Sequence, residues 1–442
     1  MRTRLATLWE RLRTNFWFVP ALLTAAAAAL AFGMVWMDHA IGDRRLDAAA
    51  WIYTGSAEGA RSLLSTLASA MITVAGVVFS ITIVALTLAS SQLGPRLLRN
   101  FMRDLGNQVT LGTFIATFVY CLLVVRSVRG SSGAEFVPHV SVSVAIALAL
   151  TSLGVLIYFI HHAATSIQAP NVIAAVGAEL EQAIDRIFPE TIGVEAVPGA
   201  GDLDDAASPS TGQSEARPVA SEGTGYVQVI DEERLMGLAV EHDVVVHLLR
   251  RPGHFVAPHL PIASVRPAAR CDDTLAAAIR DTAVVGSQRT VAQDVEFAID
   301  QLVEVAVRAL SPGVNDPFTA IQCVERLGAA LARLADRRIP SPYRRDAAGR
   351  LRVIAYPWTF EALLDAALNQ IRQHARSSVA VSMALLQAIA SVAARVRRPA
   401  DRAALLAQAE IIAGQASCAA PEPRDRADLR RCYEASLAAL AR

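Results

Sequence analysis

The stretch from Ser62 to Gln92 contains no charged side chain, and it constrains this chain more than any other feature. An α-helix rises 1.5 Å per residue, so this stretch would be roughly 45 Å long, whereas the hydrocarbon core of a bilayer is about 30 Å thick. The stretch therefore predicts a membrane-spanning helix that tilts, projects beyond the bilayer or lies inside a bundle.

Three further stretches, residues 15–37, 107–125 and 136–160, are also apolar enough to span. The chain as a whole has 53% hydrophobic residues, only 19% charged residues and a mean hydropathy of +0.36, which is unusual for a soluble protein. The predicted fold is therefore a membrane α-helical one, with a four-helix transmembrane domain over residues 1–165 and the lipid bilayer as its partner.

Arginine placement predicts the orientation of the spans. Arg2, Arg4, Arg11 and Arg13 precede the first span, and Arg96, Arg99 and Arg103 follow the second. Loops that are rich in Lys or Arg stay in the cytoplasm, so we expect both termini to be cytoplasmic.

The remaining chain is predicted to be a cytoplasmic part with a small α/β module and a helical domain. A connecting helix over residues 166–192 leads into residues 193–225, which are rich in Gly, Pro, Ser and acidic residues and predict a flexible linker. Short alternating strands around a helix from Asp231 to Glu241 predict the α/β module over residues 226–268. Residues 269–442 follow as the helical domain, with helices expected near residues 295–310, 317–327, 357–375, 379–396 and 425–440.

Composition and motifs give no case for catalysis. The formal net charge is zero, which gives no support for nucleic-acid binding. The five cysteines lack metal spacing and predict free thiols, and we find no glycine-rich phosphate loop, zinc motif or nucleophile elbow. We therefore expect no enzyme, no cofactor and no metal.

Several segments together resemble the bacterial membrane-protein family called DUF2254, a domain of unknown function. They are the four spans, the corner at residues 90–96 (SSQLGPR), and residues 308–320 (RALSPGVNDPFTA), with supporting matches at residues 297–303 and 371–373. The resemblance implies a multi-pass protein of the bacterial inner membrane and supplies no reaction.

Within the second span, the small polar residues fall on one helical line, because their mean spacing is close to the 3.6 residues of a turn. One interpretation is a pore-lining face in a ring of subunits, with Val84 as a dewetting constriction; the other is close packing of helices through small residues. The candidate pore-lining residues are Ser62, Thr66, Ser69, Thr73, Gly76, Ser80, Val84, Thr87 and Ser91.

The arginines after this span, Arg96, Arg99 and Arg103, either form a vestibule that attracts anions or lipid head groups, or only determine topology. Of His161 and His162, one is expected to face the bundle and one to face away, which argues against joint metal binding.

Two features of the carboxy-terminal half are interpreted as structural. The corner formed by Ser311, Pro312, Gly313, Asn315, Asp316 and Pro317 has an N-cap carboxylate followed by a first-turn proline, so we favour a helix corner over an anion site. Asp294 and Glu296, like the pair Glu304 and Arg308, are expected to be ordinary charges on a helix surface.

The leading hypothesis is a homo-oligomeric inner-membrane channel whose second span lines a hydroxyl-rich pore that conducts ions. The alternative is a membrane-anchored sensor or scaffold, whose cytoplasmic domain binds an unknown partner while the spans only anchor and oligomerise.

Overall fold

The computed structural model describes residues 16–41, 53–97, 104–129, 136–188 and 216–441. The chain divides into an N-terminal unit, Met1–Asn171, and a C-terminal unit, Val172–Arg442.

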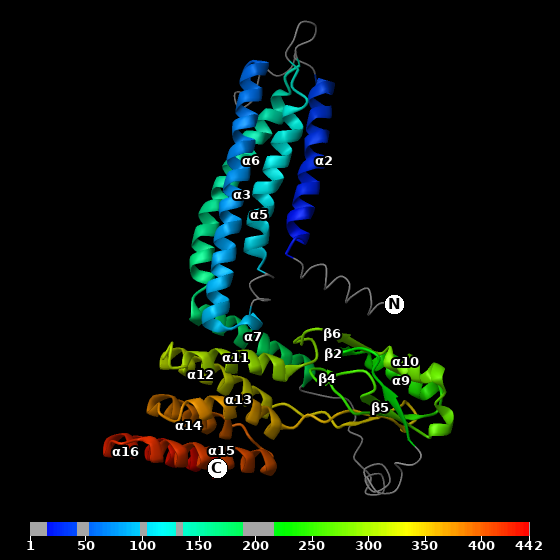
Figure 1. Cartoon of the computed structure of the whole chain (residues 1–442), viewed down its shortest axis with the longest axis vertical. Coiled ribbons are helices and arrows are strands. Elements are labelled where there is room, and N and C mark those ends of the chain that lie inside the picture. The colour runs from blue at the N-terminus through cyan, green and yellow to red at the C-terminus, as the bar shows by residue number, and fades with distance from the viewer. Residues whose placement is uncertain (1–15, 42–52, 98–103, 130–135, 189–215, 442) are drawn as a thin grey trace. The chain divides into compact units, whose positions relative to one another are not determined.

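The N-terminal unit is a bundle of long apolar helices. Among the described residues, four helices are long and apolar enough to cross a membrane, which agrees with the four predicted spans. Helix α5 lies between α2 and α3 (Figure 1), and 56% of its most apolar window is buried, against 11% for α2 and for α3. The helices are α2 (Phe18–Ile41), α3 (Ala57–Leu93), α5 (Leu105–Val125) and α6 (His139–Ser166).

The predicted loop between the first two spans is shorter in the structure, because α2 continues through Asp38 to Ile41. The Asp38 carboxylate is only 6% exposed. Its Oδ1 accepts from the backbone N–H of Val140 at 3.0 Å, and its Oδ2 accepts from the backbone N–H and hydroxyl of Ser141 at 2.9 and 2.6 Å. Pro138 stands at the N-cap of α6 and gives no side-chain bond, so Asp38 caps α6 from another helix.

Helix α7 (Ala169–Ile187) matches the predicted connecting helix. Its apolar face, which includes Val172, Val176 and Leu180, is buried. On its polar side, Asp185 accepts hydrogen bonds from Arg333 of helix α12 (Pro317–Ala335) and from Arg337, which follows that helix.

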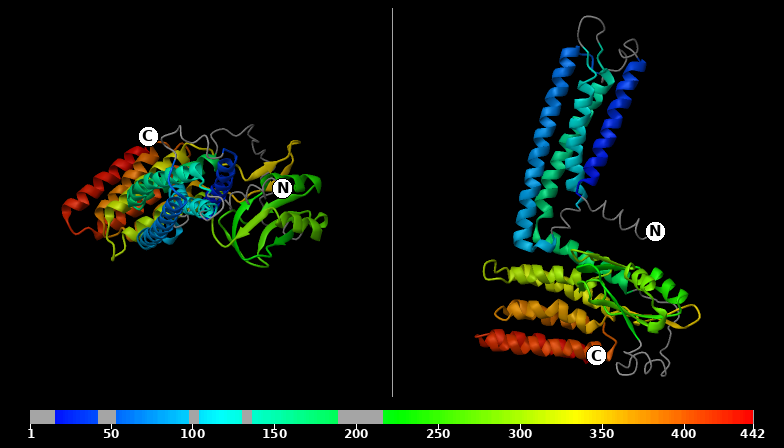
Figure 2. Two further views of the ribbon diagram at one scale, coloured as in Figure 1. Left: turned by 90° about the horizontal axis from the view of Figure 1, so that it is seen from above. Right: turned by 45° about the vertical axis from the view of Figure 1, so that its right-hand side comes forward.

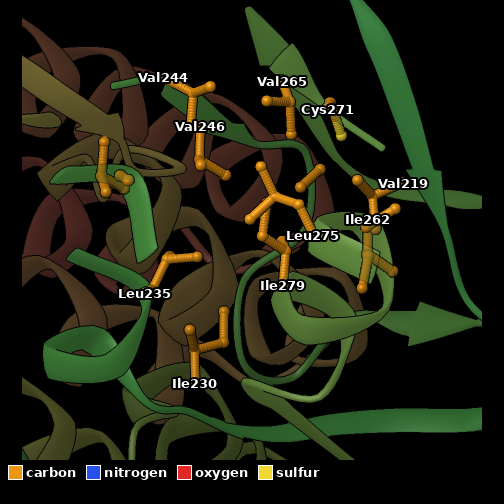
Figure 3. Close-up of a cluster of buried hydrophobic side chains, with 14 of the residues drawn as sticks. Val219, Ile230, Leu235, Val244, Val246, Ile262, Val265, Cys271, Leu275 and Ile279 are labelled. Atoms are coloured by element: carbon orange, nitrogen blue, oxygen red, sulfur yellow. The ribbon is translucent and has the colours of Figure 1, made fainter. Parts of the chain in front are cut away.

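The α/β part of the C-terminal unit contains two sheets, with strand orders β1-β5-β3-β8-β7 and β4-β2-β6. Figure 3 shows its core, in which Leu235, Leu275 and Ile279 from the two helices pack with strand residues such as Val246 and Val265. The strands are β1 (Arg217–Ala220), β2 (Gly225–Ile230), β3 (Val245–Leu248), β4 (Phe255–Val256), β5 (Pro261–Arg266), β6 (Ala283–Gly286), β7 (Tyr343–Arg345) and β8 (Leu351–Ile354). The helices are α9 (Glu232–Glu241) and α10 (Asp273–Arg280).

This module is larger than the predicted segment 226–268. Strand β1 lies at residues 217–220, inside the predicted linker 193–225, whose part up to residue 215 lies outside the described residues. Strands β7 and β8 come from within the predicted helical domain 269–442, and β8 pairs in parallel with β3 through Val246↔Val353. The buried Arg352 of β8 fixes this pairing, because it donates to Asp243 at 2.7 Å and to Asp346 at 2.8 Å.

The other helices of the C-terminal unit are stacked pair upon pair (Figures 1 and 2). Helix α11 packs against α12 and α13, and α14 packs against α12, α15 and α16. Helix α15 was not predicted, because its buried residues, such as Leu405, Ala409 and Ile412, alternate with other alanines that blur the apolar face. The helices are α11 (Val295–Ala309), α12 (Pro317–Ala335), α13 (Phe360–His374), α14 (Val379–Ala393), α15 (Pro399–Ala419) and α16 (Pro423–Leu440).

The cap that Asp38 gives to α6 can be tested by Asp38→Ala. We expect a lower thermal unfolding midpoint in detergent, because the loss of a helix cap costs about 1 kcal/mol. The control is Glu58→Gln, which changes an exposed carboxylate in the first turn of α3. Equal midpoints for Asp38→Ala and Glu58→Gln would contradict the assigned cap.

Candidate functional site

The ends of α3 are defined by its local sequence. Ser56 is the N-cap and accepts a hydrogen bond from the backbone N–H of Gly59 at 3.2 Å, and Glu58 adds a negative charge to the first turn. Gly94 ends the helix with a φ of 120°, a conformation that favours glycine. The helix has 37 residues and is therefore roughly 55 Å long.

All nine candidate pore-lining residues lie on the exposed side of α3. The buried side is formed by seven residues, Ala57, Ala60, Leu64, Ala68, Ala75, Val78 and Ala89. At about 100° per residue, these two sets lie on opposite sides of the helix. A Cβ added at Gly76 would meet nothing within 4 Å, so this position is open. The polar line therefore does not serve packing within the described part of the chain.

Hydroxyl groups on the polar line are bonded to the helix's own backbone. The Oγ1 atoms of Thr66 and Thr73 each donate to the carbonyl four residues earlier at 2.8 Å, Thr87 does so at 2.9 Å, and Ser91 donates to Leu88 O at 2.9 Å. Their protons are thus engaged, and the oxygen lone pairs remain available outward. Such a face can accept hydrogen bonds from water or contact cations.

Apolar side chains flank the polar line on both sides. Ile72, Phe79 and Ile83 lie exposed along one flank, and Val77 and Ile81 along the other. Val84, the one large apolar residue on the line itself, is 64% exposed. The face is thus a polar centre between two apolar borders, interrupted at one level by Val84.

Of the three arginines after α3, the structure describes Arg96, which is exposed in the short 3-10 helix η2 (Pro95–Leu97). Arg99 and Arg103 lie outside the described residues. The vestibule therefore stays a prediction.

The two adjacent histidines face different ways, as expected. His161 is exposed, whereas His162 Nε2 lies 2.8 Å from Asp104 Oδ2. Asp104 is also the N-cap of α5 and accepts from the backbone N–H of Gly106 at 2.7 Å. This contact joins the end of α6 to the start of α5.

The corner between α11 and α12 has the local structure that the sequence predicts. Asn315 adopts a left-handed φ of 49°, and Asp316 caps α12 by accepting from the backbone N–H and hydroxyl of Thr319 at 3.1 and 2.6 Å. Pro312 and Gly313 are exposed at its tip, and Pro317 occupies the first helical turn. The hydrogen bond from Thr319 lowers the pKa of Asp316, so a carboxylate occupies the helix start where an anion would bind.

The backbone carbonyls of Ser311 and Ala309 accept hydrogen bonds from the other N–H groups of this corner. The N–H groups of Val314 and Asn315 donate to Ser311 O at 3.0 and 2.9 Å, and that of Asp316 donates to Ala309 O at 2.7 Å. These donors are occupied within the chain, which supports the structural interpretation of the corner over an anion site.

The prediction for Asp294 is wrong: this residue is 1% exposed and caps α11 instead of lying on a helix surface. Arg289 donates two hydrogen bonds to the Asp294 carboxylate, at 2.7 and 3.0 Å, and one to Asp300 at 2.7 Å. Gly253 is needed beside this carboxylate, because its φ is 95° and a Cβ would lie 2.3 Å from Asp294 Oδ2.

A second group around Arg251 was not identified in the sequence. The Arg251 guanidinium pairs with Glu296 of α11, and its Cζ lies 3.7 Å from the centre of the Trp358 ring. Its Nε donates to His254 Nε2 at 3.2 Å, and the ring of His254 meets Tyr356 edge to face. These contacts join strand-end loops to α11, and no short sequence motif signals them because their members come from three distant segments.

Comparison with known proteins finds relatives without an assigned activity. A family model described as "Predicted membrane protein (DUF2254)" matches residues 13–391. Uncharacterized proteins of Mycobacterium bovis and Mycobacterium tuberculosis are each 33% identical over 383 residues, which cover 85% of this chain and 72% of the relative. No solved structure matches the chain significantly.

The burial of His254 predicts a pH dependence of stability. Burial, and then the neighbouring Arg251 and Arg250, lower the pKa of His254 to about 4, whereas an unfolded histidine titrates near about 6.5. Between these values the unfolded chain binds a proton that the folded chain does not, so stability falls as the pH drops from about 7 to about 4. We expect His254→Phe to reduce the fall in thermal midpoint between pH 7 and pH 5, measured on the full chain in detergent.

The matched control is His374→Asn, which changes an exposed histidine at the end of α13. If the thermal midpoint falls by the same amount between the two pH values in His254→Phe and in the unmodified chain, His254 is not the group that titrates.

Proposed function

Because the chain belongs to the DUF2254 family of predicted membrane proteins, we propose that it is a homo-oligomeric channel of the bacterial inner membrane, with α3 of each copy lining the pore. In this proposal both termini and the C-terminal unit are cytoplasmic, and the chain conducts ions through a hydroxyl-rich path. It has no catalytic role and uses no cofactor.

The observation that carries the proposal is the arrangement of α3. Its polar line is exposed along the whole helix and lies opposite the side that packs against its own bundle. In a ring of identical copies, a polar centre can face a water-filled lumen while the apolar flanks contact the neighbouring copies. In this arrangement the buried side of α3 packs in its own bundle, the apolar flanks contact the neighbouring copies, and the polar line faces the lumen.

Val84 is the proposed constriction. It is the one large apolar side chain on the polar line, and it is 64% exposed instead of being buried against α5 or α6. A ring of valines narrows a pore and removes hydrogen-bond partners for water at one level, which favours dewetting. The C-terminal end of α3 lies beyond Val84. In this proposal Arg96, Arg99 and Arg103 follow that end and add positive charge there.

The alternative, a membrane-anchored sensor or scaffold, requires no pore. In that case the hydroxyls of α3 face lipid with their protons held by backbone carbonyls, as their hydrogen bonds permit. The two proposals differ in the number of copies and in ion flux.

The mass of the purified protein in a gentle detergent or nanodisc tests the ring. A pore lined by one helix from each copy needs roughly four or more copies. We therefore expect a mass of at least four chains. A monomer or dimer would rule out this pore and leave the anchored sensor as the better proposal.

Ion flux into liposomes tests the constriction. We expect Val84→Ser to increase the flux several-fold over the unmodified chain. A serine hydroxyl can bond to water at the proposed constriction and so favours a hydrated pore there. The control is Ile81→Ser, which introduces the same side chain on the exposed flank of α3 but off the polar line. The assignment of Val84 fails if Val84→Ser conducts no more than the unmodified chain, or if Ile81→Ser raises the flux equally.

A further inference from the structure

The N-terminal unit contains a cavity of about 300 Å³ to which all four of its helices or their ends contribute. The walls come from the segment before α2, from α3, from the start of α5 and from the end of α6. They are Phe16, Trp17, Phe79, Thr82, Ile83, Ala85, Leu86, Asn107, Phe159, Ala163, Ser166 and Ile167. Most of this lining is apolar, with Phe79 and Phe159 providing aromatic walls. Ligand pockets typically combine such an apolar body with a few polar groups that fix orientation.

Asn107 is the polar group that singles out this cavity. Its side chain is 8% exposed and lines the cavity, yet its carboxamide has no hydrogen-bond partner among the residues that the structure describes. Only its backbone N–H is bonded, at 3.3 Å to the Asp104 carboxylate. An amide that lines an apolar cavity and has no partner in the chain can bond to a molecule bound there, which would stabilise that molecule.

Water alone fits this cavity poorly. A buried water needs two to four polar partners. Besides Asn107 and Trp17, the wall offers water only the hydroxyl oxygens of Thr82 and Ser166, as acceptors. Thr82 donates to Val78 O at 2.8 Å, and Ser166 donates to Ala163 O at 3.5 Å. The remaining walls are hydrocarbon, which favours an apolar chain with one polar end.

We propose that this cavity binds one acyl chain of a membrane phospholipid, with the ester carbonyl of that chain accepting a hydrogen bond from the Asn107 carboxamide. The polar end is placed by Asn107 in the first turn of α5 and by Ser166 at the last residue of α6. The chain's methylenes then contact Phe79, Ile83 and Phe159. This site lies within one copy and goes beyond the proposed channel, because it requires neither a pore nor a ring.

The charge beside Asn107 favours an ester over a free carboxylate. Asp104 caps α5 three residues earlier and already occupies the backbone N–H groups of Gly106 and Asn107. A fatty-acid carboxylate at Asn107 would lie beside this aspartate, which also contacts His162 Nε2 at 2.8 Å, and is therefore less favourable there than a neutral ester carbonyl. The site therefore distinguishes a phospholipid from a free fatty acid.

Photocrosslinking in the membrane tests the site on the full chain. The protein is reconstituted in vesicles doped with a phosphatidylethanolamine that bears a diazirine in one acyl chain, illuminated, digested and mapped by mass spectrometry. We expect adducts concentrated at the lining residues Phe79, Thr82, Ile83, Ala85, Leu86, Phe159, Ala163, Ser166 and Ile167. A parallel sample with a diazirine fatty acid is expected to label these residues at least several-fold less.

Two variants alter the site and one serves as control. Ala163→Phe fills the cavity from α6, and Asn107→Leu removes the amide while keeping a similar volume; each is expected to reduce adducts in these residues several-fold. Leu150→Phe enlarges a side chain of α6 that is 65% exposed and not part of the cavity, and is expected to leave them unchanged. Ala85→Phe, which fills the cavity from α3, replaces Ala163→Phe if the latter does not fold.

The outcomes separate the alternatives. Adducts spread evenly over the exposed apolar surface, or equal labelling of Ala163→Phe and the unmodified chain, would overturn the site. Stronger labelling of the cavity by the fatty acid would overturn the assignment to a phospholipid ester. Since the labelling is measured per chain, it is independent of whether the protein conducts ions or forms a ring.

Discussion

The packing of helices around α5 determines which surfaces of the N-terminal unit are buried and which are exposed. Helices α2, α3 and α6 all contact α5, whose Phe114 and Tyr120 are almost fully buried. Two buried hydrogen bonds join α5 to α6: the hydroxyls of Thr117 and Ser152 are 3.0 Å apart, and the Tyr120 hydroxyl donates to Ser141 O at 3.1 Å. Because α5 occupies one side of α3, the opposite side has no neighbour within the described chain, and that side carries the hydroxyl line.

Sequence periodicity predicted the helices of the N-terminal unit, but it could not predict which side of each helix packs against its neighbours. A helical wheel fixes the angle between residues of one helix, so the nine-residue line on α3 followed from spacing alone. It does not fix which side of the helix the neighbouring helices occupy. The sequence therefore left pore lining and packing open. The exposure of Ser69, Thr73 and Ser80 shows that they do not pack against the residues that the structure describes.

The limits of sequence-based reasoning are clearest where distant segments meet. The corner at Asn315 and Asp316 was predictable, because a left-handed residue, a cap and a proline act within a few residues of each other. Strand β8 was not, because its partner strand β3 lies far away in the chain. Asp294 has a near partner, Arg289 five residues earlier, but its burial involves distant residues such as Gly253. Asn107 likewise looked like one more residue of an apolar span, since the cavity around it is formed by α3, α6 and the two residues before α2.

The cap that Asp38 gives to α6 makes the N-terminal end of α6 depend on the position of α2. Helix α6 begins after Pro138, which cannot satisfy the free N–H groups of Val140 and Ser141. Those groups stay without their acceptor until the end of α2, about a hundred residues earlier, lies beside them. The last helix of the bundle is therefore completed by the first, and a chain that mispositions α2 retains exposed donors that mark it as incompletely assembled.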